Sequence, residues 1–329
     1  MGPVSLKERY KGIFDVGAAV WPGAPGTHGE LIKRHFSCLT CENVMKPTLL
    51  QPERGRYAFS AADKLVEFAA QNGMKMRGHT LVWHNQTPSW FFQSPGGGEA
   101  SREELLSTLE EHTRTVMGRY KGRVYCWDVV NEALADSSGG FLRGSPYLRI
   151  IGEDYIDRAF HIAHEADPDA LLFYNEYNEC DSEKRERLYT LVKELRERDV
   201  PVHGIGMQMH SYLESPSAGD IRAAIERYAS LGVVLHVTEL EISVYEWDDR
   251  RTDLKAPSPQ MLERQAERYG ELFALFREYK DVVTCVTTWG VADDYTWLDD
   301  FPQKGRKNWP LLFDMNHQPK AAFDRVTEF

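Results

Sequence analysis

The chain has 329 residues, of which 42% are hydrophobic, so it is long enough to bury a substantial core. Its length alone would suggest two domains, although α/β barrels often reach about 250 residues or more as a single domain. The formal net charge of -11 argues against a nucleic-acid or anionic-membrane partner, because both attract basic surfaces.

Short apolar runs alternate with longer helical patterns along the chain. The eight predicted strands are residues 15–20, 38–43, 74–83, 125–132, 170–178, 203–210, 233–242 and 283–290. The 3.6-residue periodicity predicts helices between them, including residues 61–72, 102–120, 147–165, 182–198, 219–230 and 259–279. The expected N-caps are Ser60, Ser101, Asp181 and Ser258, and left-handed C-caps are expected at Gly73 and Gly232.

This alternation predicts parallel βαβ units, and eight such units predict an α/β fold, a single (β/α)8 TIM barrel over residues 1–329. No GxGxxG or Walker loop follows a strand, which disfavours an open nucleotide-binding sheet. The segments after the strands are long, at residues 84–100, 133–146, 211–218, 243–258 and 291–318. In a barrel these long loops gather at the C-terminal face, where the active sites of this fold lie.

The N-terminal residues and the cysteines bear on the cellular location. Residues 1–9 are polar, and no stretch of about 18 apolar residues follows. We therefore expect a cytoplasmic protein, although a secreted protein without its signal peptide would look similar. Cys38, Cys126 and Cys285 lie in apolar runs, where a free thiol behaves as a small hydrophobe. Cys38 and Cys41 have CxxC spacing, but no second pair completes a zinc site.

Two of the predicted strands carry a glutamate near their C-terminal ends. Glu132 closes the fourth strand, and Glu239 lies in the seventh. A buried carboxylate costs several kcal/mol unless it is paired or hydrogen-bonded. Two carboxylates in the same setting favour a pair for acid–base or nucleophilic chemistry over two strand-end salt bridges.

Other polar and aromatic residues share this strand-end position. They are Asn43, Lys46, His79, Trp83, His84, Asn131, Asn175, Tyr177, Asn178, Gln208, His210, Trp289 and Trp297. Neutral donors and acceptors pair with hydroxyl groups, and indole faces cover the apolar faces of sugar rings, so the set favours carbohydrate binding. Two glutamates among such residues indicate glycoside hydrolysis, with one carboxyl protonated and the other ionised. The alternative is a metal-dependent hydrolase that uses His79, His84 and His210.

Five motifs, in chain order, resemble family 10 of the glycoside hydrolases, the retaining β-1,4-xylanases. They are GHTLVWH at 78–84, WDVVNE at 127–132, GMQMH at 206–210, VTELE at 237–241 and TWGVAD at 288–293. The resemblance implies that Glu132 is the general acid/base and Glu239 the nucleophile, with carboxyl groups about 5–5.5 Å apart. It implies neither a metal nor a cofactor.

The resemblance also assigns the remaining residues to sugar subsites. The residues around the −1 sugar would be Lys46, His79, Trp83, Asn131, Gln208 and His210. Glu42 and Asn43 would contact the −2 sugar, Trp289 and Trp297 would line the glycone side, and Tyr177 would lie on the aglycone side. Glu241 departs from the aspartate found in many members, and we expect its longer side chain to alter the hydrogen bonds that set the pKa of His210.

The expected substrate is xylan or, as in the compact intracellular xylanases of bacteria, xylo-oligosaccharides. Two alternatives stay open at this point. One is a β-1,4-glucanase with the same pair of glutamates, and the other is a sugar-binding barrel without catalytic activity. The sequence leaves the oligomeric state open.

Overall fold

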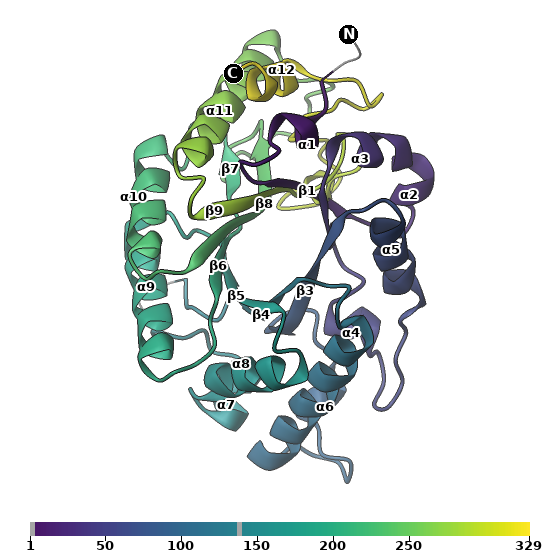
Figure 1. The fold of residues 1–329 in the computed structure, drawn as a ribbon, viewed down its shortest axis with the longest axis vertical. Coiled ribbons are helices and arrows are strands. Elements are labelled where there is room, and N and C mark those ends of the chain that lie inside the picture. The colour runs from purple at the N-terminus through teal and green to yellow at the C-terminus, as the bar shows by residue number, and fades with distance from the viewer. Residues whose placement is uncertain (1–3, 137–139) are drawn as a thin grey trace.

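The computed structural model describes residues 4–136 and 140–329 of the chain. Its centre is a closed barrel of eight parallel strands, seen end-on in Figure 1. These strands are β1 (Asp15–Val20), β2 (Cys38–Cys41), β3 (Lys75–Trp83), β4 (Cys126–Asn131), β5 (Leu171–Glu176), β6 (Gly204–Met207), β8 (Val234–Ser243) and β9 (Val283–Thr288). They pair in that order, and β9 pairs with β1 to close the barrel. The predicted (β/α)8 architecture is therefore confirmed.

Helices surround the barrel, as Figure 1 shows. The longer ones are α5 (Ser60–Gln71), α6 (Arg102–Tyr120), α8 (Tyr155–Ala166), α9 (Ser182–Glu197), α10 (Ala218–Ala229) and α11 (Pro259–Glu278). The shorter ones are α1 (Leu6–Arg9), α2 (Ala24–Thr27), α3 (Gly29–His35), α4 (Pro47–Leu50), α7 (Pro146–Ile151) and α12 (Ala321–Thr327). In the described part of the chain, no helix has the length and apolar character needed to cross a membrane.

Most of the predicted helix ends are confirmed, and two predictions are wrong. Ser101, Asp181 and Ser258 cap their helices with side-chain hydrogen bonds, and Gly73 and Gly232 have φ of +64° and +67°. Ser60 is not an N-cap, because Phe59 occupies that position and Ser60 is already helical. The predicted helix at 147–165 is two helices, because Gly152 has a φ of +101° that ends α7.

The predicted sixth strand, residues 203–210, is also interrupted. Its ladder ends at Met207, Met209 takes a left-handed φ of +60°, and the short strand β7 (His210–Tyr212) follows. β7 pairs in parallel with β8, in a register that places His210 opposite Glu241. This break in the strand brings a histidine beside the seventh strand of the barrel.

Buried side chains fill the space between the barrel and its helices in one large apolar cluster. All five cysteines are free and buried, which agrees with the expectation for Cys38, Cys126 and Cys285. Two sequence predictions fall partly outside the described residues. They are the long loop at 133–146, which contains residues 137–139, and the polar N-terminus, which contains residues 1–3.

Candidate active site

Glu132 and Glu239 both lie at the C-terminal face of the barrel. Glu132 directly follows the last residue of β4, and its φ of +56° is left-handed, which is uncommon for a residue with a side chain. Its backbone amide still donates to the carbonyl of Asn175, 2.9 Å away on the neighbouring strand. Glu239 lies within β8 and is 5% exposed.

The carboxylate of Glu132 is half-buried and accepts three hydrogen bonds. The indole of Trp83 donates to one oxygen over 2.8 Å. The amides of Gln208 and Asn131 donate to the other oxygen over 3.0 and 3.2 Å. Donors from β3, from β4 and from the break between β6 and β7 therefore fix the orientation of this carboxylate.

Asn175 links the surroundings of the two glutamates. Its amide nitrogen donates to Glu239 Oε1 and to Asn131 Oδ1, both over 2.9 Å. Its oxygen accepts from Thr238 over 2.8 Å, which fixes the orientation of the amide. Asn175 lies opposite Gly206 on β6, where an added Cβ would come within 2.1 Å of the Asn175 oxygen. The glycine therefore makes room for the amide that joins the two sides of the site.

His210 holds the second oxygen of Glu239. Its Nε2 lies 3.2 Å from Glu239 Oε2, and its Nδ1 lies 2.7 Å from Glu241 Oε1. The same oxygen of Glu241 accepts from the Trp297 indole over 2.7 Å. The longer side chain of Glu241 thus reaches both partners, and its other oxygen is buried without a hydrogen-bond partner.

Burial and neighbouring charges have opposite effects on the pKa values of Glu239, His210 and Glu241. Burial would raise the pKa of Glu239, but the hydrogen bond from His210, the charges of His79 and His210, and the Asn175 amide lower it to about 2. Burial would lower the pKa of His210, but its bonds to the two carboxylates raise it to about 10. Burial raises the pKa of Glu241 despite its bond from His210. At neutral pH the Glu239 carboxylate is therefore ionised beside an imidazolium.

A buried lysine occupies the side of the site next to β2. The Lys46 ammonium donates to Asn43 over 2.9 Å and lies 4.9 Å from the centre of the Trp83 ring. Burial lowers its pKa, and the carboxylates of Glu239, Glu42 and Glu132 oppose that effect. Glu42 is 8% exposed, and burial raises its pKa.

His79, predicted to contact the −1 sugar, and Trp289, predicted to line the glycone side, also lie at this site. His79 is buried on β3, and its Nδ1 lies 2.9 Å from the carboxylate of Asp128, which also forms an ion pair with Arg77 inside the barrel. The Trp289 ring meets His79 edge-on, with ring centres 5.4 Å apart, and meets His210 edge-on at 6.4 Å. The rings of these three residues form one continuous edge of the site.

Trp297 and Tyr177 are held by different groups of side chains. The Trp297 ring centre is 5.3 Å from that of His210, and the ring stacks on Phe301 at 4.9 Å. The Tyr177 hydroxyl donates to Asp136 over 2.5 Å and accepts from Arg143 over 2.7 Å. A cleft of about 600 Å³ is lined by residues that include Asp136, Asn178, Lys184, His210, Tyr212 and Ser215.

Sequence reasoning did not identify several of the supporting residues. Asp128 orients His79 from an apolar strand, and Asp136, Arg143 and Lys184 hold Tyr177 from two other segments. Asp128 lies within the WDVVNE motif, so an acidic residue inside an apolar run was the available signal. The others come from loop and helix positions without a distinctive local pattern.

The alternative metal site from His79, His84 and His210 is not formed. His79 is bonded to Asp128, and His210 uses both ring nitrogens on carboxylates. His84 packs edge-on against Trp83. Within residues 4–136 and 140–329, the one group with the spacing of metal ligands is elsewhere, at His28, Asp294 and His317.

Comparisons with known proteins agree over the full length of the chain. The family profile described as "Glycosyl hydrolase family 10" matches residues 5–329. The chain is 58% identical over 322 residues to an endo-1,4-beta-xylanase of Geobacillus stearothermophilus, covering 98% of this chain and 97% of that protein. It is 54% identical to endo-1,4-beta-xylanase B of Paenibacillus barcinonensis, with 98% and 97% covered. The crystal structure of xylanase XynB from Paenibacillus barcinonensis, complexed with a conduramine derivative, superposes with a TM-score of 0.98 at 53% identity, covering 99% of each chain.

Proposed function

The chain belongs to glycosyl hydrolase family 10, and from this we propose that it is a retaining endo-β-1,4-xylanase. In this proposal Glu239 is the nucleophile and Glu132 is the general acid/base. The names of the similar proteins from Geobacillus stearothermophilus and Paenibacillus barcinonensis, both endo-1,4-beta-xylanases, support the substrate class.

The observation that carries the assignment of roles is the unequal setting of the two carboxylates. Glu239 is buried between His210 and Asn175, and its pKa of about 2 keeps it ionised at neutral pH. A nucleophile needs that ionised form. Glu132 is half-buried and bonded only to neutral donors, the Trp83 indole and two amides. Its partial exposure gives Glu132 access both to a leaving group and to water, as a general acid/base requires.

In the first step, a Glu239 oxygen attacks the anomeric carbon and forms a glycosyl ester. The glycosidic carbon–oxygen bond breaks, and the proton of Glu132 passes to the departing oxygen. The ester of Glu239 carries no charge, so the imidazolium of His210 then keeps its hydrogen bond to Glu241 alone. In the second step, Glu132 takes a proton from water, the hydroxide attacks the same carbon, and Glu239 leaves as a carboxylate.

The surrounding residues supply sugar contacts in this proposal. Asn131 and Gln208 already donate to Glu132, so they lie close enough to contact hydroxyl groups of a sugar at the reacting position. Trp289 and Trp297 provide aromatic surfaces next to His210. We propose that these two indoles crowd the space that the hydroxymethyl group of a glucose unit would need, which favours xylose.

The test of this function is a product profile. Purified protein would be given xylohexaose and polymeric glucuronoxylan side by side, and products would be followed over time. Cleavage of internal linkages supports the proposal, and rapid processing of xylohexaose to xylobiose and xylose, with slow attack on polymer, would favour the oligosaccharide as the working substrate. No cleavage of either would refute the proposal and favour the non-catalytic sugar-binding alternative.

Two controls separate the remaining possibilities. The ratio of activities on aryl β-xylobioside and aryl β-cellobioside distinguishes a xylanase from a β-1,4-glucanase on the same fold. The anomeric form of the first product, read by proton NMR, distinguishes retention from inversion. Retention goes with a carboxylate separation of about 5–5.5 Å, and inversion with one beyond about 6.5 Å.

A cytoplasmic location is a further proposal. Xylanase activity in the lysate of the native source, but not in its culture medium, would support it.

A further inference from the structure

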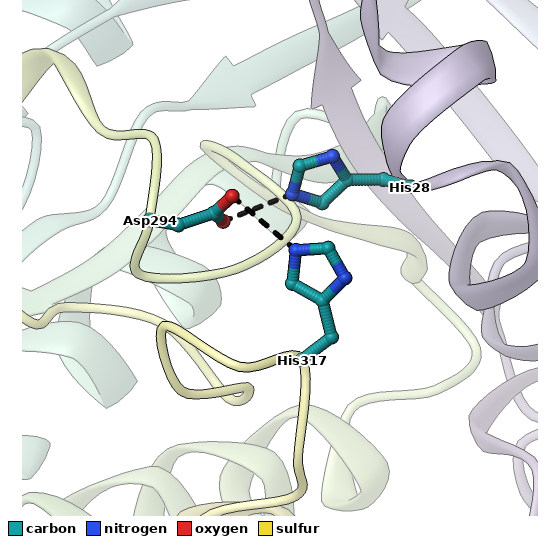
Figure 2. A group of neighbouring side chains, drawn as sticks. All are labelled: His28, Asp294 and His317. Carbon is teal, nitrogen blue, oxygen red and sulfur yellow. Dashed lines mark hydrogen bonds and ion pairs between the residues drawn. The ribbon is translucent and has the colours of Figure 1, made fainter.

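Two histidines and an aspartate from distant parts of the chain meet outside the catalytic cleft. His28 joins α2 to α3, Asp294 follows β9, and His317 precedes α12. Figure 2 shows the carboxylate of Asp294 beside the two imidazole rings, with a dashed line to each. His28 Nε2 lies 2.9 Å from one Asp294 oxygen, and His317 Nε2 lies 3.2 Å from the other. The three ligand atoms all lie within 4.8 Å of one another.

We propose that His28, Asp294 and His317 bind a divalent transition-metal ion of the Zn²⁺ class, which ties the N-terminal helices to the C-terminal segment. Two imidazole nitrogens and a carboxylate oxygen are a donor set that suits Zn²⁺. With metal–ligand bonds of about 2.0–2.2 Å, tetrahedral ligand atoms lie roughly 3.4 Å apart. The observed separations need only small side-chain adjustments to reach this geometry.

The outer contacts of His28 favour ligation through Nε2. Its Nδ1 lies 2.7 Å from the hydroxyl of Thr27, and that hydroxyl can donate its own hydrogen to the carbonyl of Gly23, 3.3 Å away. Nδ1–H then donates to Thr27, and the lone pair of Nε2 faces Asp294. A partner of this kind on the second ring nitrogen is the usual support of a metal-bound histidine. The imidazole of His28 is also 2% exposed, so its orientation is fixed by packing.

His317 is held in an unfavourable backbone conformation that directs its ring inward. Its φ is +62°, a left-handed value that a residue with a side chain adopts at a cost. A tight turn imposes it, because the carboxylate of Asp314 accepts from the amides of Asn316 and Gln318 over 2.7 and 2.8 Å. The rings of His28 and His317 lie with their centres 4.1 Å apart.

A metal ion could reach these three side chains from solvent, and its binding would stabilise the fold. A surface cavity of about 360 Å³ is lined by both histidines, with Pro25, Thr27, Glu30 and Leu31. An ion can therefore reach the ligands from solvent, and water can complete its coordination. His28 and Asp294 are 266 positions apart in sequence. An ion at this site would join two segments that separate on unfolding, so it would stabilise the folded chain.

The site also adjoins the aromatic surface near the glycone side. The residue after Asp294 is Tyr295, whose ring stacks on Trp21 with centres 4.0 Å apart and whose hydroxyl interacts with Glu42. Trp21 in turn meets His28 edge-on at 4.9 Å. The ion would steady this surface without being part of the hydrogen bonds of Glu132 and Glu239.

The test is Zn²⁺ binding by the full chain after treatment with a chelator and desalting. Calorimetric titration and the zinc content after a second desalting should both give one Zn²⁺ per chain. Excess Zn²⁺ should also raise the melting temperature, whereas Mg²⁺ and Ca²⁺, which prefer oxygen ligands, should not. Hydrolysis of aryl β-xylobioside at 25 °C should continue in the presence of chelator.

Two variants and a matched control make the result specific. His317→Asn keeps a residue that tolerates the left-handed turn but removes the imidazole, and Asp294→Asn keeps the shape but removes the charge. Each should weaken Zn²⁺ binding at least tenfold and abolish the thermal shift. His161→Ala removes an exposed histidine on α8 and should bind as the unaltered protein does. Absence of stoichiometric binding, or equal binding by His317→Asn and the unaltered protein, would overturn the proposal.

Discussion

Replacing His210 with alanine removes the main support of the ionised Glu239. Burial raises the pKa of Glu239, and the bond and charge of His210, with the charge of His79, lower it from the ordinary 4.5 to about 2. That difference corresponds to a preference for the carboxylate on the order of 3 kcal/mol. Without the imidazole, burial dominates, so we expect the pKa of Glu239 to rise toward or above 4.5.

The sign of the effect on activity follows from the proposed role of Glu239 as nucleophile. A nucleophilic carboxylate is active only when ionised, so activity falls as the pH drops through its pKa. In the unaltered protein Glu239 stays ionised from about pH 4 upward. Its protonation therefore does not lower kcat/KM at the acidic end of the pH range that is measured. In His210→Ala the loss of kcat/KM should move into the range of about pH 4–6. The assay is kcat/KM on aryl β-xylobioside from about pH 4 to about pH 9, which reports groups of the free enzyme.

A control variant and a graded variant test the explanation. Gln208→Ala removes a donor to Glu132 rather than to Glu239 and should leave the position of the acidic limb unchanged. His210→Asn keeps a neutral donor without the charge and should give an intermediate profile. Removing His210 also removes a hydrogen-bond partner of the buried Glu241, so folding must be checked separately. Circular dichroism at pH 7 would establish that each variant is folded. If folded His210→Ala showed the acidic limb of the unaltered protein, the proposed electrostatic support of Glu239 would be refuted.

Three further results are expected. Glu239→Ala should abolish turnover, and azide should restore part of it as an α-glycosyl azide detectable by NMR; a β-azide would contradict the role of Glu239 as nucleophile. Glu132→Ala should lower kcat/KM on xylan by about 10²–10⁴-fold, with a smaller loss of kcat/KM on aryl xylobiosides, because kcat/KM reports the first step and acidic leaving groups need little protonation there; equal losses of kcat/KM on both would argue against Glu132 as the acid. Ser101→Ala removes the capping box formed with Glu104 on α6 and should lower the free energy of unfolding by about 1 kcal/mol in urea denaturation; an unchanged midpoint and slope would show that the cap contributes nothing.

The barrel and the position of the two glutamates could be predicted because their signals are local. Alternating apolar runs and 3.6-residue patterns arise from neighbours in sequence, and they predicted eight strands in the correct order. Parallel strands place their C-terminal ends on one face, so Glu132 and Glu239 could be assigned to that face without coordinates. The left-handed glycines after α5 and α10 were predictable for the same local reason.

The predictions that failed concern breaks in regular structure. The strand at 203–210 stops at Met207, and the helix at 147–165 stops at Gly152. Both stretches keep an apolar pattern across the break, so periodicity alone could not find it. Ser60 has the composition of an N-cap, but the backbone of Phe59 already occupies the cap position.

The fold class and the strand-end positions of Glu132 and Glu239 were predictable from the sequence alone, because hydrophobic period and position in a strand are properties of adjacent residues. The partners of these residues depend on the three-dimensional arrangement of the chain. The register of β7 on β8 sets His210 between Glu239 and Glu241, and an apolar strand supplies Asp128 to His79. Barrel closure likewise brings His28 to Asp294 across 266 positions. A hydrogen bond requires its two heavy atoms to lie about 3 Å apart. No local sequence pattern specifies which atoms from distant parts of the chain will come that close.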